Sequence, residues 1–409
     1  MEKNGKREGA SSLESVPGFR AAAIAAEFRD WPKPRNDLAL IVADAPASAA
    51  GVFTRNQVAA APVKIDRKHL KASGGVARAL LVNAGVANAC TGREGRDNAL
   101  KCIRRLGGRI GAPDEQVLIA STGVIGVQLP LAKMEKGIDK AVSGLGKGKP
   151  GDFARAILTT DLRPKESFAV LDGEGGVVMA GACKGSGMIA PNMATMLAFV
   201  LTNAAVAPKA LAAALDEVVP STFNMVTVDG DTSTNDSLFL LASGTTRTPA
   251  IGKSSGKLFG RFVDGLHQVC LSLSTQIAAD GEGASKLVRV RVTGARKRRE
   301  AAVAARTIAE SPLVKTAMFG NDPNWGRVIC ALGRSDAAVD EEKVSMSLCG
   351  CAMFAKGAPL PFDKAELSGL MRAEEVELLI DLGLGKAEAV ALTCDLTHGY
   401  ITINADYTT

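Results

Sequence analysis

Residues 184–200 read KGSGMIAPNMATMLAFV, and the expected fold follows from this stretch. A loop with two glycines and one proline runs through Ala194 into Thr195. The apolar run at 196–201 that follows predicts a strand. The pattern alone favours an ordinary loop leading into a strand.

A second interpretation gives this loop a chemical role. A glycine-rich loop can strain a peptide bond, and Ala194 is small enough for the Thr195 hydroxyl to approach its carbonyl carbon. Attack there would give an ester, and hydrolysis of the ester would leave Thr195 as a new N-terminus. Its α-amine, with an ordinary pKa of about 7.7–8.0, could act as the base for its own hydroxyl.

Short apolar runs between turn residues predict strands on both sides of this loop, at 38–43, 79–82, 117–120, 168–171, 177–180, 196–201 and 238–242. The sequence DGEG at 172–175 predicts a hairpin turn between two of them. Helical periodicity favours helices at 209–218, 258–277 and 299–309.

From residue 287 onward the pattern starts again. It predicts strands at 287–292, 327–332, 344–349 and 377–382, with helices between them, and hence a smaller α+β lobe near residues 290–390. A last strand at 400–404 is expected to return to the first lobe.

Composition excludes several classes of protein. Of 409 residues, 46% are hydrophobic, yet no apolar run is long enough to span a bilayer, so a cytoplasmic protein without membrane contact is expected. The net charge is +6, but the basic run at 296–299 precedes a helical stretch and is not flanked by stacking aromatics, so no nucleic-acid partner is expected.

Motifs for metals and cofactors fail on single positions. The P-loop-like GKS at 252–254 lacks the earlier glycine, because Arg247 stands there. The acidic segment at 229–236 has Thr234 where a calcium loop needs glycine. The eight cysteines are scattered and the three histidines dispersed. Neither a metal nor a cofactor is expected.

A resemblance overturns the ordinary-loop interpretation. The chain resembles the ornithine acetyltransferase family, the self-cleaving glutamate N-acetyltransferases of arginine biosynthesis, from residue 18 to the C-terminus. The matching blocks are KGSGMIAPNMAT at 184–195, GFRAA at 18–22, GVFTRN at 51–56, NAGVANA at 83–89, STGVIG at 121–126, TTD at 159–161, TVDGDTSTND at 227–236 and GNDPNWGR at 320–327.

The resemblance implies a layered α/β (α+β) fold, similar to N-terminal-nucleophile hydrolases, plus the smaller lobe. Cleavage would give an α chain, residues 1–194 with a polar tail at 1–17, and a β chain, residues 195–409, whose C-terminal segment returns to the active site. The family also implies a heterotetramer of two α and two β chains.

The resemblance also implies site residues. Thr195 would be the nucleophile, with the cleaved bond between Ala194 and Thr195, and Thr122 and Gly123 would form the oxyanion hole. The residues that match the family's substrate contacts are Thr159, Lys184, Thr195, Glu282, Asn404 and Thr409. The choice of Thr159 over Thr160 stays open, as does the substrate group that each charge meets.

The implied reaction moves an acetyl group from N2-acetylornithine to glutamate through acetyl-Thr195, in a ping-pong sequence. Whether acetyl-CoA is a second donor stays open. The alternative is a related self-cleaving aminopeptidase or amide hydrolase, which would deliver the acyl group to water.

Overall fold

Along the apolar strands of the larger lobe, successive side chains point to opposite faces of the sheet. Each face packs against another layer. The computed structural model describes residues 12–171, 176–190 and 196–406. One eight-stranded sheet runs in the order β4-β3-β2-β8-β7-β6-β5, with β1 paired to β2. Its strands are β1 (Phe19–Ile24), β2 (Leu38–Phe53), β3 (Val76–Val86), β4 (Val117–Val124), β5 (Lys165–Val170), β6 (Val178–Lys184), β7 (Leu197–Thr202) and β8 (Ser237–Ala242).

The long strand β2 joins two halves of this sheet. Its first part pairs with β1 and β3, its last part pairs with β8, and the register with β3 shifts between Val42 and Ala47. A shift of this kind bends a strand. The two halves therefore pack face to face, as a shared core of residues from β2, β3, β4, β6, β7 and β8 shows.

Phenylalanines fill the centre of that core. The rings of Phe153 and Phe199 meet edge to face with centroids 5.1 Å apart, and Phe199 stacks on Phe239 at 5.9 Å. Leu197, Phe199 and Leu201 face this layer, whereas the intervening Ala198 and Val200 face the opposite side of the sheet. Buried on both faces, β7 is fixed in register.

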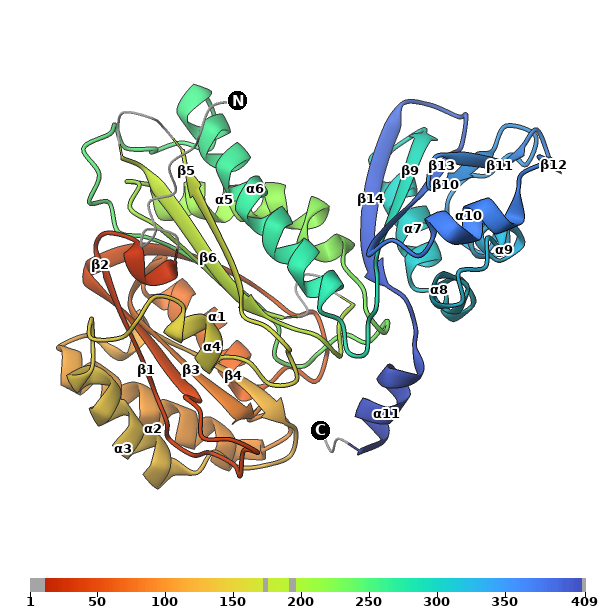
Figure 1. Ribbon diagram of the computed structural model, residues 1–409. Helices are drawn as coiled ribbons and strands as arrows, with labels where there is room; N and C mark the ends of the chain where they lie inside the picture. Colours follow the sequence, from red (N-terminus) through yellow and green to blue (C-terminus); the bar gives the residue numbers. More distant parts are fainter. Residues whose placement is uncertain (1–11, 172–175, 191–195, 407–409) are drawn as a thin grey trace, which may run out of the picture.

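Helices cover both outer faces, giving a helix–sheet–sheet–helix sandwich (Figure 1). One face packs on α5 (Pro208–Val218) and α6 (Lys257–Ala279), and the other on α2 (Gly92–Ile110) and α3 (Leu131–Ser143). The remaining short elements of this lobe are α1 (Ala61–Ala72), α4 (Asp152–Ala156), η1 (Leu13–Ser15), η2 (Asp114–Gln116), η3 (Val219–Ser221) and η4 (Phe223–Met225). The layered α/β class predicted from the sequence is confirmed.

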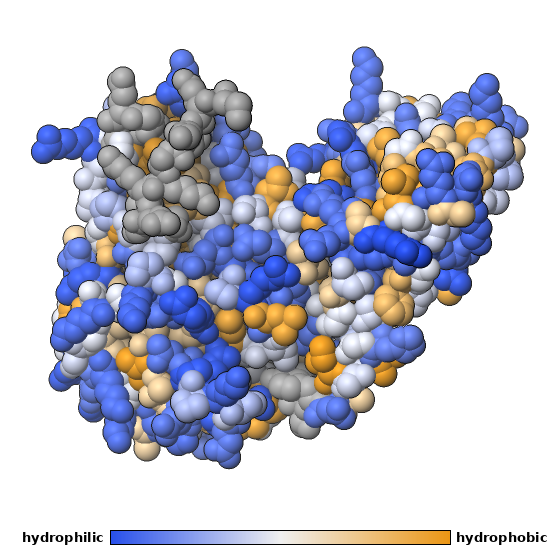
Figure 2. All heavy atoms as spheres, in the orientation of Figure 1, coloured by the Kyte–Doolittle hydropathy of each residue, from blue (hydrophilic) through white to orange (hydrophobic). Residues whose placement is uncertain are grey.

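The smaller lobe has its own six-stranded sheet in the order β12-β11-β10-β13-β9-β14. Alanines and Ile308 of α7, spaced three and four residues apart, pack on the valines of β9. Its elements are β9 (Leu287–Ala295), β10 (Ser345–Leu348), β11 (Cys351–Ala355), β12 (Ala358–Pro359), β13 (Glu375–Asp381), β14 (Ala387–Cys394), α7 (Arg298–Ala309), α8 (Pro312–Phe319), α9 (Trp325–Gly333) and α10 (Lys364–Leu370). Figure 2 shows a notch between the two lobes on one face, with hydrophilic side chains over most of its surroundings.

Two strand predictions are wrong. Residues 327–332 lie in helix α9, which begins where the Asn324 side chain accepts a hydrogen bond from Arg327 N at 3.2 Å. Residues 400–404 lie in helix α11 (His398–Asp406), which follows β14 and lies below the junction of the lobes in the view of Figure 1. A helix satisfies its backbone groups within itself and needs no free sheet edge.

The predicted hairpin is confirmed, because β5 and β6 pair antiparallel from Lys165↔Cys183 to Val170↔Val178. The turn residues 172–175 and the N-terminal residues 1–11 lie outside the described part of the chain. No helix among the described residues is both long and apolar enough to cross a membrane.

Candidate active site

A pocket of about 380 Å³ opens where the ends of several strands and α11 meet. Hydroxyl, amide and carboxylate side chains dominate its wall, which favours a small polar ligand over an apolar one. The lining residues are Asn56, Ala87, Thr122, Gly123, Ile125, Thr159, Thr160, Lys184, Gly187, Met188, Asp229, Asp231, Thr232, Ser233, Thr234, Asn235, Glu282, Tyr400 and Asn404.

The structure brings six of the residues singled out in the sequence to this pocket, from positions up to 282 residues apart. They are Thr122, Gly123, Thr159, Lys184, Glu282 and Asn404. Three others, Ala194, Thr195 and Thr409, lie outside the described residues. Met196, the residue that follows Thr195, lines a second cavity of about 30 Å³ whose wall shares Thr122 and Lys184 with the pocket.

Gly123 holds a backbone conformation that only glycine fits. Its φ is +130°, and a Cβ added to it would lie 2.2 Å from the carbonyl carbon of Gly85 on the neighbouring strand β3. This close approach occurs at the end of β4, where the register between β3 and β4 shifts. The peptide groups around Gly123 are therefore fixed in place at the pocket wall.

Lys184, the last residue of β6, extends its ammonium group between two hydroxyls. Nζ donates to Thr159 Oγ1 at 2.7 Å and to Thr122 Oγ1 at 3.3 Å. The neighbouring Thr160 instead shares a hydrogen bond with Ser186 at 2.8 Å. Burial lowers the pKa of Lys184, and the Asp161 carboxylate opposes this only in part.

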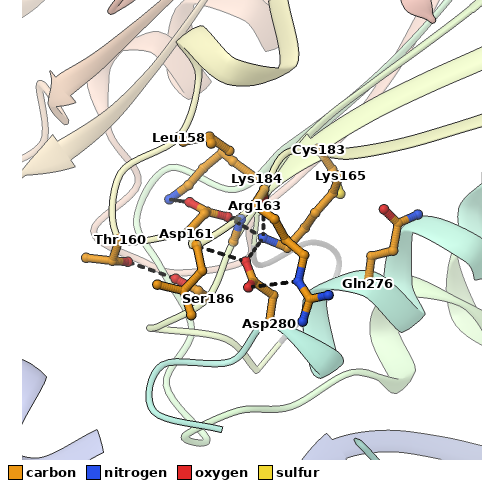
Figure 3. A network of polar contacts seen from close by, with 12 residues as sticks. Leu158, Thr160, Asp161, Arg163, Lys165, Cys183, Lys184, Ser186, Gln276 and Asp280 are labelled. Carbon is orange, nitrogen blue, oxygen red and sulfur yellow. Dashed lines mark hydrogen bonds and ion pairs between the residues drawn. The ribbon is translucent and has the colours of Figure 1, made fainter. Parts of the chain in front are cut away.

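Behind Lys184 lies a buried ion-pair cluster that sequence reasoning did not identify (Figure 3). The ammonium of Lys165, itself fully buried, lies 2.7 Å from Asp161 Oδ1 and 2.5 Å from Asp280 Oδ2. Asp161 also accepts a hydrogen bond from Gly185 N at 2.6 Å, at the start of the glycine-rich loop. The cluster thus ties β5, β6 and the end of α6 to that loop.

Asp161 is ionised at neutral pH in spite of its burial. Burial alone would raise the pKa of Asp161, but Lys184 and Lys165 outweigh it and bring the pKa to about 2. The only signal in the sequence was its place in the TTD block at 159–161. Asp280, the second carboxylate that pairs with Lys165, is more than a hundred residues away along the chain, so this pairing follows from the fold alone.

A second charged group faces the pocket beyond the glycine-rich loop. Asn404 Nδ2, on α11, donates to Glu282 Oε2 at 2.8 Å. Gly187 leaves room for this carboxylate, since a Cβ added there would lie 2.3 Å from Glu282 Oε2. The C-terminal helix and the loop therefore meet at Glu282.

Asp229 anchors the same loop from another side. Its carboxylate accepts hydrogen bonds from Met188 N at 2.6 Å and Ile189 N at 2.8 Å, and it lies 3.5 Å from the Tyr400 hydroxyl. Burial raises the pKa of Asp229, and these backbone donors oppose that shift. Asp229 thereby couples α11 to the loop. Among the described residues, no group of three or more His, Cys, Asp or Glu side chains is arranged to hold a metal.

The layered fold and this pocket of hydroxyls, one lysine and several carboxylates define an α/β protein with a site for a small polar ligand. The model of the ArgJ family matches residues 20–409. The chain belongs to the ArgJ family.

The sequences of individual relatives align with nearly the whole chain. The arginine biosynthesis bifunctional protein ArgJ of Nitratidesulfovibrio vulgaris is 46% identical over 396 residues, covering 96% of this chain and 99% of its own length. The ArgJ protein of Thermus thermophilus is 48% identical over 392 residues, covering 96% of this chain and 98% of its own length. A crystal structure of the Bacillus halodurans protein is 39% identical with a TM-score of 0.50 and covers 51% of this chain and 98% of the solved one. The prediction of an acyltransferase of arginine biosynthesis is thereby confirmed.

Proposed function

We propose that this chain cuts its own Ala194–Thr195 bond and that Thr195 then carries an acetyl group from N2-acetylornithine to glutamate. One observation carries the proposal: Thr122, Gly123, Thr159, Lys184, Glu282 and Asn404 line one pocket. The cavity lined by Met196 shares walls with that pocket, and Met196 follows the proposed nucleophile directly in the chain.

Cleavage comes first. The Thr195 hydroxyl oxygen attacks the carbonyl carbon of Ala194, the C–N bond breaks, and the acyl group moves to the oxygen as an ester. Water then hydrolyses the ester, which leaves a carboxylate on Ala194 and a free amine and hydroxyl on Thr195. The half-length solved chain from Bacillus halodurans, 98% of which is matched by 51% of this chain, supports processing into two pieces.

Transfer uses the same hydroxyl. The α-amine of Thr195 takes the hydroxyl proton as the oxygen attacks the acetyl carbon of acetylornithine. The Thr122 hydroxyl and the Gly123 N–H stabilise the tetrahedral oxyanion, and a donor of this kind is worth about 10²–10³ in rate. Ornithine leaves with the proton, and the amino group of glutamate then attacks acetyl-Thr195 to give N-acetylglutamate.

The charges of the pocket suit these amino acids. Lys184 donates to the uncharged Thr159 and Thr122, and its ion pair with Asp161 is long at 4.0 Å, so its charge can still pair with a substrate carboxylate. The carboxylates of Glu282, Asp229 and Asp231 on other parts of the wall can attract an ammonium group. The contact between Thr159 and Lys184 supports Thr159 over Thr160 as a substrate contact.

An acetyl-transfer assay tests the proposal. Purified protein with acetylornithine and glutamate should form N-acetylglutamate, while acetylornithine alone should release little acetate. Release of acetate at the same rate with and without glutamate would support the amide hydrolase instead. Replacing acetylornithine by acetyl-CoA in the same assay tests the second donor, which the word bifunctional in the relatives' names makes worth measuring. We further propose an assembly of two α and two β chains, which the native mass of the cut protein would test.

A further inference from the structure

The segment between β1 and β2, residues 25–37, has no part in the proposed mechanism. Within it Asp37 is fully buried, and its carboxyl group accepts hydrogen bonds from Ala26 N at 2.7 Å and Phe28 N at 2.8 Å. The same group accepts the indole N–H of Trp31 at 3.0 Å. Donors from three residues therefore converge on one side chain, which fixes the position of the Trp31 ring.

The Trp31 ring packs on the larger sheet beside the pocket. A Cβ added to Gly85, on β3, would lie 3.3 Å from Trp31 Cζ2 and 3.3 Å from Arg29 Cδ, so these two side chains cover the Gly85 backbone closely. Gly85 is in turn the ladder partner of Gly123 on β4, whose own added Cβ would meet the Gly85 carbonyl carbon. Trp31 thus limits the movement of the strand that touches the Gly123 peptide.

Arg35 connects the same ring to a second part of the pocket wall. Its guanidinium carbon lies 4.5 Å from the centre of the Trp31 ring, which is a cation–π contact. Its Nη2 atom donates to the carbonyl oxygens of Arg155 at 2.8 Å and Leu158 at 3.0 Å. Stacking on the ring orients the planar guanidinium, so that its N–H groups point at these two carbonyls.

The peptide group between Leu158 and Thr159 is bound at both of its polar atoms. Its carbonyl oxygen accepts the hydrogen bond from Arg35, and its N–H donates to Asp161 Oδ2 at 3.2 Å. The chain at Thr159 is therefore held from two sides. This keeps the Thr159 hydroxyl within 2.7 Å of Lys184 Nζ at the pocket wall.

We propose that Trp31 is a positioning residue for two parts of the pocket wall. Through Gly85 it holds the Gly123 peptide in place. Through Arg35 it holds Thr159. The inference rests on the proposed function, which assigns Gly123 to the oxyanion and Thr159 to the substrate. The indole makes and breaks no covalent bond, and the residues that line the pocket within the described part of the chain do not include it.

The two connections predict different kinetic effects. An oxyanion donor acts in the transition state, so a displaced Gly123 lowers kcat, whereas a displaced Thr159 weakens substrate binding and raises KM. Trp31→Leu removes the aromatic face and the indole N–H together. We expect kcat for N-acetylglutamate formation to fall at least about 10-fold and KM for glutamate to rise at least about 3-fold. Rates are expressed per cut chain, so that slower self-cleavage does not enter kcat.

Two further variants separate the connections. Trp31→Phe keeps an aromatic face for Arg35 but lacks the second ring, whose Cζ2 atom meets Gly85. Its KM should return towards the wild-type value while its kcat stays low. Arg35→Lys keeps the charge but not the planar fork of donors, so it should raise KM and leave kcat unchanged. Should W31L fail to fold, W31F and R35K decide the question alone.

Trp325→Leu is the matched control. Trp325 stacks on Phe354 in the smaller lobe, with ring centroids 5.5 Å apart, and it does not line the pocket either. Its replacement should lower the melting temperature, as W31L does, and leave kcat and KM at wild-type values. This comparison separates the positioning of the pocket from a general loss of stability.

Three results would overturn the inference: wild-type kcat and KM in W31L and W31F, equal kinetic losses in W31L and W325L, or an R35K enzyme whose kcat falls while its KM is unchanged. Failure of the proposed function looks different. In that case the wild-type protein itself forms no N-acetylglutamate.

Discussion

The ammonium nitrogen of Lys184 lies 2.7 Å from Thr159 Oγ1, and the residue is buried at the wall of the pocket. The same nitrogen lies 3.3 Å from Thr122 Oγ1. One cation therefore connects a residue expected to touch substrate with a residue expected to stabilise the oxyanion. Any change at Lys184 should register in substrate binding first.

Replacing Lys184 by methionine should raise KM for glutamate by at least about 10-fold, because a buried charge-assisted contact with a carboxylate is worth about 1.5–3 kcal/mol. Burial disfavours the charged lysine, but Lys184 also helps to keep the buried Asp161 carboxylate ionised, so thermal stability should fall much less than activity. Steady-state kinetics and a melting curve measure both. Lys136→Met, on the exposed side of α3, is the control. An unchanged KM in K184M would remove the residue from the binding site.

The pH dependence of KM for glutamate should follow the protonation of Lys184. Because burial lowers the pKa of Lys184 below its ordinary 10.5, the cation is lost earlier than that of an exposed lysine as pH rises. KM for glutamate should therefore begin to rise on the alkaline side before pH 10.5. The folded state also binds fewer protons there than the unfolded state, so Lys184 makes stability increase with pH in that window. A KM that stays flat up to pH 10.5 would count against this assignment.

Gly123→Ala should abolish most activity. The substitution forces a Cβ to within 2.2 Å of Gly85 and imposes a strained φ, which together cost about 1–3 kcal/mol and displace the peptide of the oxyanion hole. Gly126→Ala is the matched control, because Gly126 also has a positive φ of +83° but no atom within 4 Å of the added Cβ. Comparing kcat and melting temperature of the two variants separates backbone strain from the close approach. Equal losses in both would argue against a special role for Gly123.

Lys165→Met should destabilise the fold strongly. The change leaves the carboxylates of Asp161 and Asp280 buried without their shared partner, at a cost of about 3–5 kcal/mol. Arg20→Met removes an ion pair with Asp44 in which both side chains are about half exposed, and should cost less than about 1 kcal/mol. Denaturant unfolding of both variants gives the comparison. A K165M protein as stable as R20M would show that the cluster contributes little.

In acid, the pH dependence of the free energy of unfolding should depend on Asp161. Its pKa of about 2 in the folded state lies below the ordinary 3.8, so its stabilising contribution is present above pH 3.8 and is lost as pH falls towards 2. Asp161→Asn should therefore show a flatter dependence of the free energy of unfolding on pH in that range. A slope identical to that of the wild type would contradict the shift.

Local patterns predicted much of the larger lobe. Strands such as β7 and β8 are continuous apolar runs bounded by polar residues, and this pattern reflects burial on both faces. The site residues came mainly from the family blocks, and those within the described residues meet in one pocket. The patterns did not predict how β2 bends, because its bulge depends on pairing with two different neighbours.

The errors have physical causes too. Ile401, Thr402 and Ile403 favour a strand by their branched side chains, yet the segment leaves the edge strand β14 and forms helix α11. In α9 the spacing of Val328, Ala331 and Leu332 is helical, but a run this short fits either structure. The Asp161–Lys165–Asp280 cluster joins distant parts of the chain, and a single sequence carries no signal for such a contact.

The most direct test of the account is the intact mass of the purified protein after incubation with N2-acetylornithine alone. We expect two chains, residues 1–194 and 195–409, with one acetyl group on the second chain, located at Thr195 by fragmentation and removed when glutamate is added. Thr195→Ala should give one uncut chain without acetyl. A wild-type protein that stays uncut, or an acetyl group carried by another residue, would contradict the account.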